Sequence, residues 1–290
     1  MYFVKPLRLG LALGGGTARA SAHVGVLKVL ERHGIKPSLI AGTSAGAMLA
    51  ALHALGLSAA ELEQIVTEPG VTRLWRSTLD PGLHRGGLIH GERFERYINE
   101  RYFHGATFSD IVTPLKIACT DVDMGELVLL QKGSLARAIR ASSAFPLMVA
   151  PTRIDGRYLA DGGLVATVPF AALDEALDVR VGVHAGVDAD ASVIIGQLRR
   201  FYRSAWGRRL DMLPERLRSR YLKTLVGGAA QIVRSYQQVI AAPPDMILLR
   251  TSPRIAWWSF ERSREAVAAG ELAARENLPA ILEARQLDKV

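Results

Sequence analysis

A serine flanked by glycines is the feature of this sequence best suited to chemistry. Residues 42–46 read G-T-S-A-G, a G-x-S-x-G pattern that lies between the apolar run Ser38–Ala41 and a second apolar run that begins at Ala47. This pattern predicts a strand that turns sharply into a helix, with Ser44 at the turn. A hydroxyl held there stands clear of the sheet, and the helix N-terminus offers N–H groups and a positive dipole end to an oxyanion. We therefore predict that Ser44 is a nucleophile.

A second glycine-rich turn lies near the start of the chain. The apolar run 7–13 leads into three consecutive glycines, and a helical pattern then continues until Gly34. A nucleotide site would need G-x-G-x-x-G or G-K-[ST], and neither spacing is present. The loop instead offers backbone N–H groups at a helix N-terminus, which suit a developing negative charge. The structural alternative is a tight turn that allows close helix–sheet packing.

Asp161 is the candidate base. It follows the strand-like residues 157–160 and precedes two glycines, so we expect it at a turn. A carboxylate can deprotonate a serine when it is close and partly desolvated, because desolvation raises its pKa. An ordinary Asp-Gly turn is the structural alternative. The competing bases are the histidines His23, His53, His84, His90 and His184.

The order of residues argues against a histidine as the base. An α/β-hydrolase triad places its histidine after the acid, and of these histidines His184 alone follows Asp161. We expect His23 to pack or hydrogen-bond behind the glycine loop. No H-E-x-x-H pair or cysteine cluster is present, so no metal or other cofactor is expected.

The remaining pattern favours one α/β domain over residues 1–290. Strand-like runs at 115–120, 179–184 and 246–249 join the three described above. Ser58 and Glu61 predict a capping box at the start of a helix that continues through Ile65. Another amphipathic helix is expected around 94–98. Residues 71–91 are interpreted as a lid or substrate-entrance segment, or as a plain surface connection.

Composition indicates the cellular compartment in which we expect the protein. The 290 residues are 49% hydrophobic, which allows a substantial core. The single cysteine, Cys119, excludes an internal disulfide and is expected in the core of a protein from a reducing compartment. No signal-peptide pattern and no apolar stretch long enough to cross a bilayer are found. We expect a cytoplasmic protein, with peripheral contact at the inner membrane surface as an option.

Positive charge is concentrated in one segment. The formal net charge is +8, and the segment 199–223 holds nine Arg and Lys residues against Asp211 and Glu215. Apolar residues recur there at helical spacing. This pattern predicts a basic amphipathic helix, Arg199–Lys223, that binds an anionic membrane. The alternative is a helix whose arginines are merely solvated. No nucleic-acid-reading motif accompanies the charge, so nucleic acid is not an expected partner.

Three motifs in this order resemble those of the patatin-like phospholipases, particularly their single-domain bacterial branch. They are L-G-G-G-x-A-R-x-x-A-H-x-G-V-L at 13–27, G-T-S-A-G at 42–46 and D-G-G-L at 161–164. The stretch 138–146, which precedes the aspartate, and the tail at 269–271 extend the resemblance over most of the chain.

The resemblance implies a three-layer α/β/α sandwich with a mainly parallel central sheet. The catalytic core would span about 7–185, followed by C-terminal helical and strand additions over 186–290. It also implies a Ser–Asp dyad without histidine, in which Ser44 attacks a lipid carboxylic ester and Asp161 takes its proton. The oxyanion and substrate-binding loop would comprise Gly14, Gly15, Gly16, Thr17 and Arg19.

The implied activity is that of a phospholipase A or lysophospholipase working through an acyl-enzyme. A thioesterase or acyltransferase with the same dyad, and a regulatory protein on the same scaffold, are the alternatives. Thr17 and Ala20 stand where relatives usually carry glycine, and 165–167 lacks an asparagine often found there. A β-branched residue resists positive φ. Either the loop therefore has an ordinary φ at Thr17, or the oxyanion site is formed by Gly15 and Gly16.

Overall fold

The structure, a computed structural model, describes residues 7–70, 87–145, 147–186, 242–243, 245–256 and 258–284. The basic segment Arg199–Lys223 lies outside the described residues, as does most of the predicted lid or entrance segment. The division into a catalytic core and C-terminal additions therefore stays a prediction.

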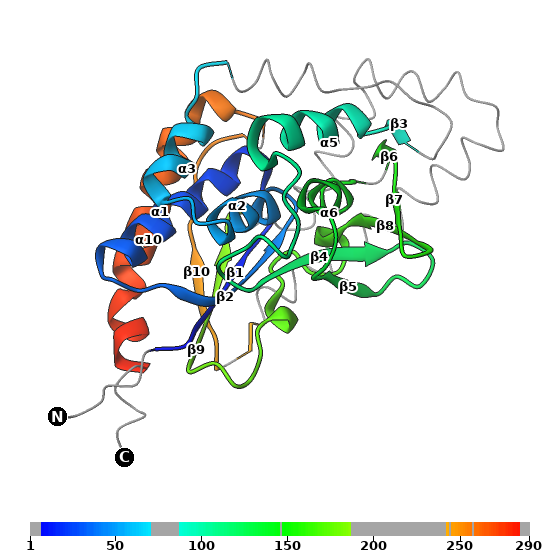
Figure 1. Cartoon of the computed structure of the whole chain (residues 1–290). Helices are drawn as coiled ribbons and strands as arrows, with labels where there is room; N and C mark the ends of the chain where they lie inside the picture. Colours follow the sequence, from blue (N-terminus) through cyan, green and yellow to red (C-terminus); the bar gives the residue numbers. More distant parts are fainter. Residues whose placement is uncertain are drawn as a thin grey trace, which may run out of the picture.

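A mixed β-sheet forms the centre of the molecule (Figure 1). The strand order is β10-β9-β1-β2-β4-β8-β7, and β5 pairs with β4. The first five strands of this order are mutually parallel, whereas β5, β8 and β7 join antiparallel. The strands are β1 (Leu9–Leu13), β2 (Pro37–Thr43), β4 (Leu115–Asp121), β5 (Leu127–Leu130), β7 (Thr152–Ile154), β8 (Arg157–Asp161), β9 (Val179–His184) and β10 (Ile247–Arg250), and a small parallel pair is formed by β3 (Gly87–Ile89) and β6 (Leu147–Val149).

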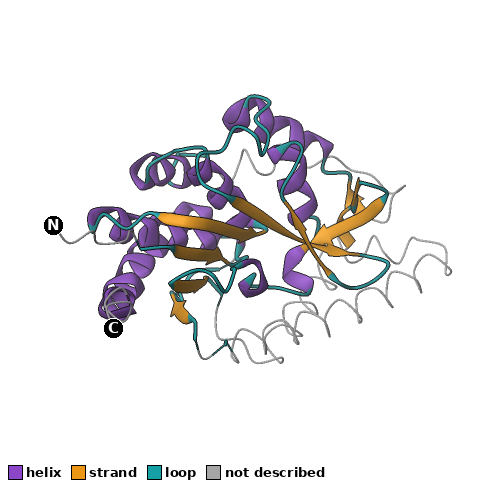
Figure 2. Ribbon diagram, turned by 60° about the horizontal axis from the view of Figure 1, so that its bottom comes forward, coloured by secondary structure: helices purple, strands orange, loops and turns teal. Residues whose placement is uncertain are grey.

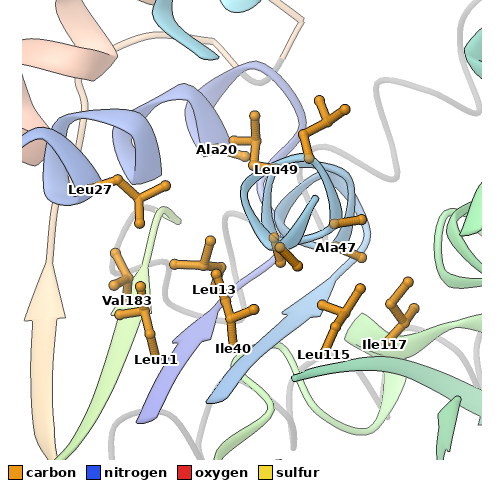
Figure 3. Packing of buried hydrophobic residues seen from close by; sticks show 14 of the residues in the cluster. Leu11, Leu13, Ala20, Leu27, Ile40, Ala47, Leu49, Leu115, Ile117 and Val183 are labelled. Atoms are coloured by element: carbon orange, nitrogen blue, oxygen red, sulfur yellow. The ribbon is translucent and has the colours of Figure 1, made fainter. Parts of the chain in front are cut away.

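Helices gather on one side of this sheet (Figure 2). They are α1 (Ala22–Arg32), α2 (Ala45–Ala54), α3 (Ala59–Val66), α5 (Glu92–Ile98), α6 (Leu135–Ser142) and α10 (Ser263–Ala284). Their apolar faces enclose Leu11 and Leu13 of β1 in the larger core cluster (Figure 3). Ala12 points to the opposite face, where it packs with Val168 and Ala172 around the short 3₁₀ helix η4 (Phe170–Ala172). The fold is thus of the α/β class with a mixed sheet.

Most local expectations are confirmed. The six predicted strands correspond to β1, β2, β4, β8, β9 and β10. The capping box of α3 is present, with Ser58 bonded to the Glu61 backbone and Glu61 bonded back to Ser58. The first helix differs, because residues Thr17–Ser21 form a 3₁₀ helix, η1, before α1 begins. Within the described ranges, no helix has the length and apolar character needed to cross a bilayer.

The C-terminal helix α10 packs along α1 (Figure 1). A Cβ added at Gly270 would lie 1.8 Å from the Ala22 carbonyl oxygen, and one at Gly25 would lie 2.0 Å from that of Val267. Glycine is therefore required at both points of this helix crossing. Lys28 of α1 also forms ion pairs with Glu63 of α3 and Glu271 of α10. The last helix is consequently part of the same core as the first.

Candidate active site

Ser44 occupies a sharp turn between β2 and α2. Its backbone has φ 54° and ψ −124°, a region that non-glycine residues rarely adopt. The flanking glycines are explained by close backbone contacts. A Cβ at Gly42 would lie 2.5 Å from the Ala47 Cα. One at Gly46 would lie 2.4 Å from the carbonyl oxygens of Leu13 and Gly14. The predicted strand–turn–helix arrangement around Ser44 is therefore confirmed.

Strand β4 brings Asp161 to this turn. Strand β5 occupies one edge of β4, so β2 and β8 follow one another along the other edge. Thr43, the last residue of β2, pairs with Ala118, and Asp161, the last residue of β8, pairs with the next residue, Cys119. The ends of β2 and β8 therefore meet, and this places the Ser44 hydroxyl close enough to the Asp161 carboxyl to lower its pKa.

The Asp161 carboxyl is strongly desolvated. The residue is only 6% exposed, and burial raises its pKa to about 6. Two groups oppose this effect on the pKa: the Gly163 N–H, which donates to Oδ1 at 2.7 Å, and the nearby Ser44 hydroxyl. Asp161 is thus ionised at neutral pH, yet is basic enough to accept a proton from a reacting serine.

The glycine loop passes beside Ser44, but its N–H groups are not equivalent. A Cβ at Gly15 would lie 3.5 Å from the Ser44 Cβ. The Gly14 N–H donates to the Val183 carbonyl and the Gly15 N–H to the Thr167 carbonyl, both at 3.0 Å. Among the described residues, the N–H groups of Gly16 and Thr17 have no hydrogen-bond acceptor. The donors left for an oxyanion are those of Gly16 and Thr17.

The expectation of an ordinary φ at Thr17 is wrong. Its φ is 51°, in the left-handed region that β-branched side chains avoid. The alternative, an oxyanion site formed by Gly15 and Gly16, also does not fit the structure, because the Gly15 N–H already donates to the Thr167 carbonyl. Ala20 needs no glycine, since it lies in η1 without a positive φ. The strain of this loop is therefore concentrated at Thr17.

Arg19 anchors the loop from behind. Its Nε donates to the Ile255 carbonyl at 2.9 Å, and the neighbouring Ser21 hydroxyl lies 3.1 Å from that of Ser263. Both partners belong to the segment that follows β10. The predicted role of Arg19 toward substrate stays a prediction, whereas its contact with Ile255 links the glycine loop to the C-terminal region.

His23 lies behind the glycine loop, as predicted. It is fully buried, and its Nε2 donates to the Gly14 carbonyl at 2.7 Å. Burial lowers its pKa to about 4, so the ring is neutral at pH 7. The groups that lower the pKa of Asp161 are the Gly163 N–H and the Ser44 hydroxyl, and no histidine is among them. The arrangement in the described residues is that of a Ser–Asp pair.

Ser142 is a member of this site that the sequence did not single out. It is fully buried at the end of α6, and its Oγ accepts a hydrogen bond from the Ser44 N–H at 2.8 Å. The signal available was its place in the stretch 138–146, which gave the resemblance but no role. The one further sequence signal for a role of Ser142 was its place on a helix face whose other residues are apolar.

The geometry supports acyl transfer. A strained serine, a desolvated carboxyl beside it, and two N–H groups with no acceptor among the described residues have the properties required of a nucleophile, a base and an oxyanion site. The two donors lie at the N-terminal end of η1, with Gly16 before its first residue, Thr17.

Comparisons with known proteins show which sequences this chain resembles. An uncharacterised NTE family protein of Mycobacterium bovis is 34% identical over 190 residues, which are 65% of this chain and 48% of that protein. The human patatin-like phospholipase domain-containing protein 6 is 33% identical over 165 residues, 56% of this chain and 12% of that protein. The matched region thus spans about half of the first relative and a small part of the second.

The fold has a solved counterpart. The crystal structure of VipD from Legionella pneumophila superposes with a TM-score of 0.60 at 17% identity, covering 95% of this chain and 67% of that one. The sequence profile described as patatin-like phospholipase matches residues 11–174, more than half of the chain and including Ser44 and Asp161. This chain therefore belongs to the patatin-like phospholipase family.

Proposed function

We propose that this protein is a serine acyl hydrolase that cleaves carboxylic esters of lipids. The observation that carries the proposal is the meeting of β2 and β8 at adjacent residues of β4, which places the strained Ser44 beside the buried Asp161. Membership of the patatin-like phospholipase family supports lipid esters as the substrate class. The matched region covers half or less of these relatives, so their names do not establish the substrate of this chain. Lipid esters as its substrate are therefore part of the proposal.

The proposed reaction has two half-reactions. The Ser44 Oγ attacks the ester carbonyl carbon as its proton passes to Asp161, and the N–H groups of Gly16 and Thr17 stabilise the oxyanion. Collapse breaks the bond to the leaving oxygen, which takes the proton from Asp161, and leaves an acyl group on Ser44. Water then attacks this acyl-enzyme, again with Asp161 as the base, and the carboxylic acid leaves as Ser44 regains its proton.

Hydrolysis by the purified chain tests the proposal. We expect turnover of a soluble chromogenic ester and of phosphatidylcholine in mixed micelles, with both activities lost in Ser44→Ala. Ser109→Ala removes an exposed hydroxyl elsewhere and is the matched control. Wild-type activity in Ser44→Ala would contradict the nucleophile assignment. Release of fatty acid from phospholipids labelled at one acyl position identifies the bond that is cut.

The alternatives give different results in the same assay. A thioesterase would show a much higher kcat/KM on acyl thioesters than on oxygen esters. An acyltransferase would transfer the acyl group to an added alcohol in preference to water. A regulatory protein would show no turnover in either the parent or the variant.

A further inference from the structure

Ser142 links the backbone of Ser44 to strand β4. Its Oγ accepts a hydrogen bond from the Ser44 N–H at 2.8 Å and donates one to the Ala118 carbonyl at 2.6 Å. A hydroxyl has one hydrogen, and a carbonyl can only accept. The hydrogen of Ser142 must therefore point to Ala118, and the lone pairs must face Ser44. The orientation of this hydroxyl is fully determined by its two partners.

The Ser44 N–H needs such a partner because of where the chain leaves the sheet. Thr43 is the last residue of β2 that pairs with β4, and at Ser44 the backbone turns into α2 with a positive φ. The Ser44 N–H is partly buried, and an N–H shielded from water without an acceptor is unfavourable. The Ser142 hydroxyl supplies the acceptor at the point where the strand pairing ends.

The Ala118 carbonyl is the fixed end of this link. It lies in β4, which also pairs with β8 one residue further along, at Cys119 and Asp161. A Cβ at Gly162 would lie 2.3 Å from the same carbonyl oxygen, so the residue after Asp161 also packs directly on it. The positions of Ser44 and Asp161 are therefore both fixed by contacts with Ala118 and Cys119 of β4.

We propose that Ser142 is a positioning residue that holds the strained backbone of Ser44 so that its hydroxyl faces Asp161. This inference rests on the proposed function, because it concerns the same serine. Ser142 does not contact the reacting atoms in this role. It acts through the Ser44 N–H, and its loss allows the turn to relax away from the reactive geometry.

Kinetics of Ser142→Ala on a soluble ester test the proposal. We expect kcat to fall about 10- to 100-fold, the range for a misplaced reacting group, with KM changed less than threefold. The acidic midpoint of the pH–kcat profile should stay at its parental value, because Asp161 keeps its surroundings. Ser143→Ala is the matched control. The Ser143 hydroxyl has no hydrogen bond to the described residues, so this variant should keep the parental kinetics.

A second variant and a second measurement guard against simple misfolding. Ser142→Cys keeps the shape of the side chain but weakens both hydrogen bonds, so it should fold and still lose kcat. Hydrogen–deuterium exchange at the Ser44 amide should be faster in Ser142→Ala than in the parent and in Ser143→Ala. This readout does not depend on catalysis.

Two results would overturn the role of Ser142. One is a folded Ser142→Ala with kcat within threefold of the parent and unchanged exchange at Ser44. The other is a shifted pH midpoint or a KM that rises as kcat falls, since either indicates a general disturbance of the site. If Ser44→Ala keeps full activity, the proposed function fails, and amide exchange alone then decides whether Ser142 holds the turn.

Discussion

Ser44, which directly follows β2, lies beside Asp161, the last residue of β8, although β2 and β8 run in opposite directions. Their meeting follows from the register of β4, where the partners of Thr43 and Asp161 are the consecutive residues Ala118 and Cys119. A shift of β8 by one residue would turn the Asp161 side chain to the other face of the sheet. The proposed dyad is thus set by backbone pairing rather than by flexible side chains.

Activity should rise with pH through the pKa of Asp161. The carboxyl must be ionised to accept the serine proton, and burial raises its pKa to about 6. We expect kcat/KM on a soluble ester to fall tenfold per pH unit well below pH 6 and to level off above pH 7. An acidic midpoint near 4, the value of a solvated aspartate, would contradict the desolvated base.

Asp161→Asn should lower activity but raise stability at alkaline pH. Loss of a positioned base typically costs about 10²–10⁴-fold in turnover. A folded pKa near 6 lies above the ~3.9 of an unfolded aspartate, so the folded state binds the proton more tightly. The parent therefore loses stability as pH rises from about 4 to 6, by about 3 kcal/mol in full. The amide cannot ionise and avoids this loss.

Denaturant unfolding of parent and Asp161→Asn at pH 4.5 and pH 8 measures this difference. The variant should gain stability relative to the parent mainly at pH 8. An equal difference at both pH values would show that Asp161 is not desolvated in the folded state.

Substitution of His23 or His184 should reduce turnover far less than Asp161→Asn does, and the opposite order would favour a histidine base.

Thr17→Gly should relieve strain in the glycine loop. Thr17 has φ 51°, and a left-handed conformation of a non-glycine residue is unfavourable by about 1–3 kcal/mol. We expect a higher unfolding free energy and a higher kcat on soluble esters, because the Thr17 N–H then reaches an oxyanion without strain. His104→Gly is the matched control, since His104 also has a positive φ, of 47°, and is exposed. It should change stability without changing kcat.

The basic segment Arg199–Lys223 can be tested separately from catalysis. Charge reversal at Arg199, Arg203 and Arg208 should leave hydrolysis of soluble esters unchanged. Binding to anionic vesicles should weaken by about 1 kcal/mol for each charge near the surface, with the difference fading as salt rises. Vesicle co-sedimentation at low and high salt is the measurement. Equal binding of parent and variant at low salt would show that these arginines are only solvated.

Sequence reasoning predicted the local structure around the candidate site because short patterns of residues determine it. The G-x-S-x-G turn follows from glycine spacing, since Gly42 and Gly46 are each contacted by backbone atoms that leave no space for a side chain. The strands were visible as apolar runs, and the α3 capping box as a pair of residues. The place of His23 behind the glycine loop was also predicted, and its bond to the Gly14 carbonyl confirms it.

Long-range pairing explains what the sequence could not supply. The Gly14 and Gly15 N–H groups are taken by carbonyls of Val183 and Thr167, more than 150 residues away, so which loop donors stay available could not be predicted. The positive φ of Thr17 contradicts its own preference, and only the surrounding contacts impose it. Ser142 likewise gains a role only because α6 ends against both β4 and the Ser44 turn.

Covalent labelling by a fluorophosphonate tests the central claim most directly. The probe reacts with a serine that is activated by a base and faces an oxyanion site, so we expect one adduct per chain, mapped by mass spectrometry to the peptide that contains Ser44. Labelling should be slowed strongly in Asp161→Asn and be absent in Ser44→Ala. An adduct on another residue, or a folded parent protein that does not label at all, would contradict the assignment of Ser44 as the nucleophile.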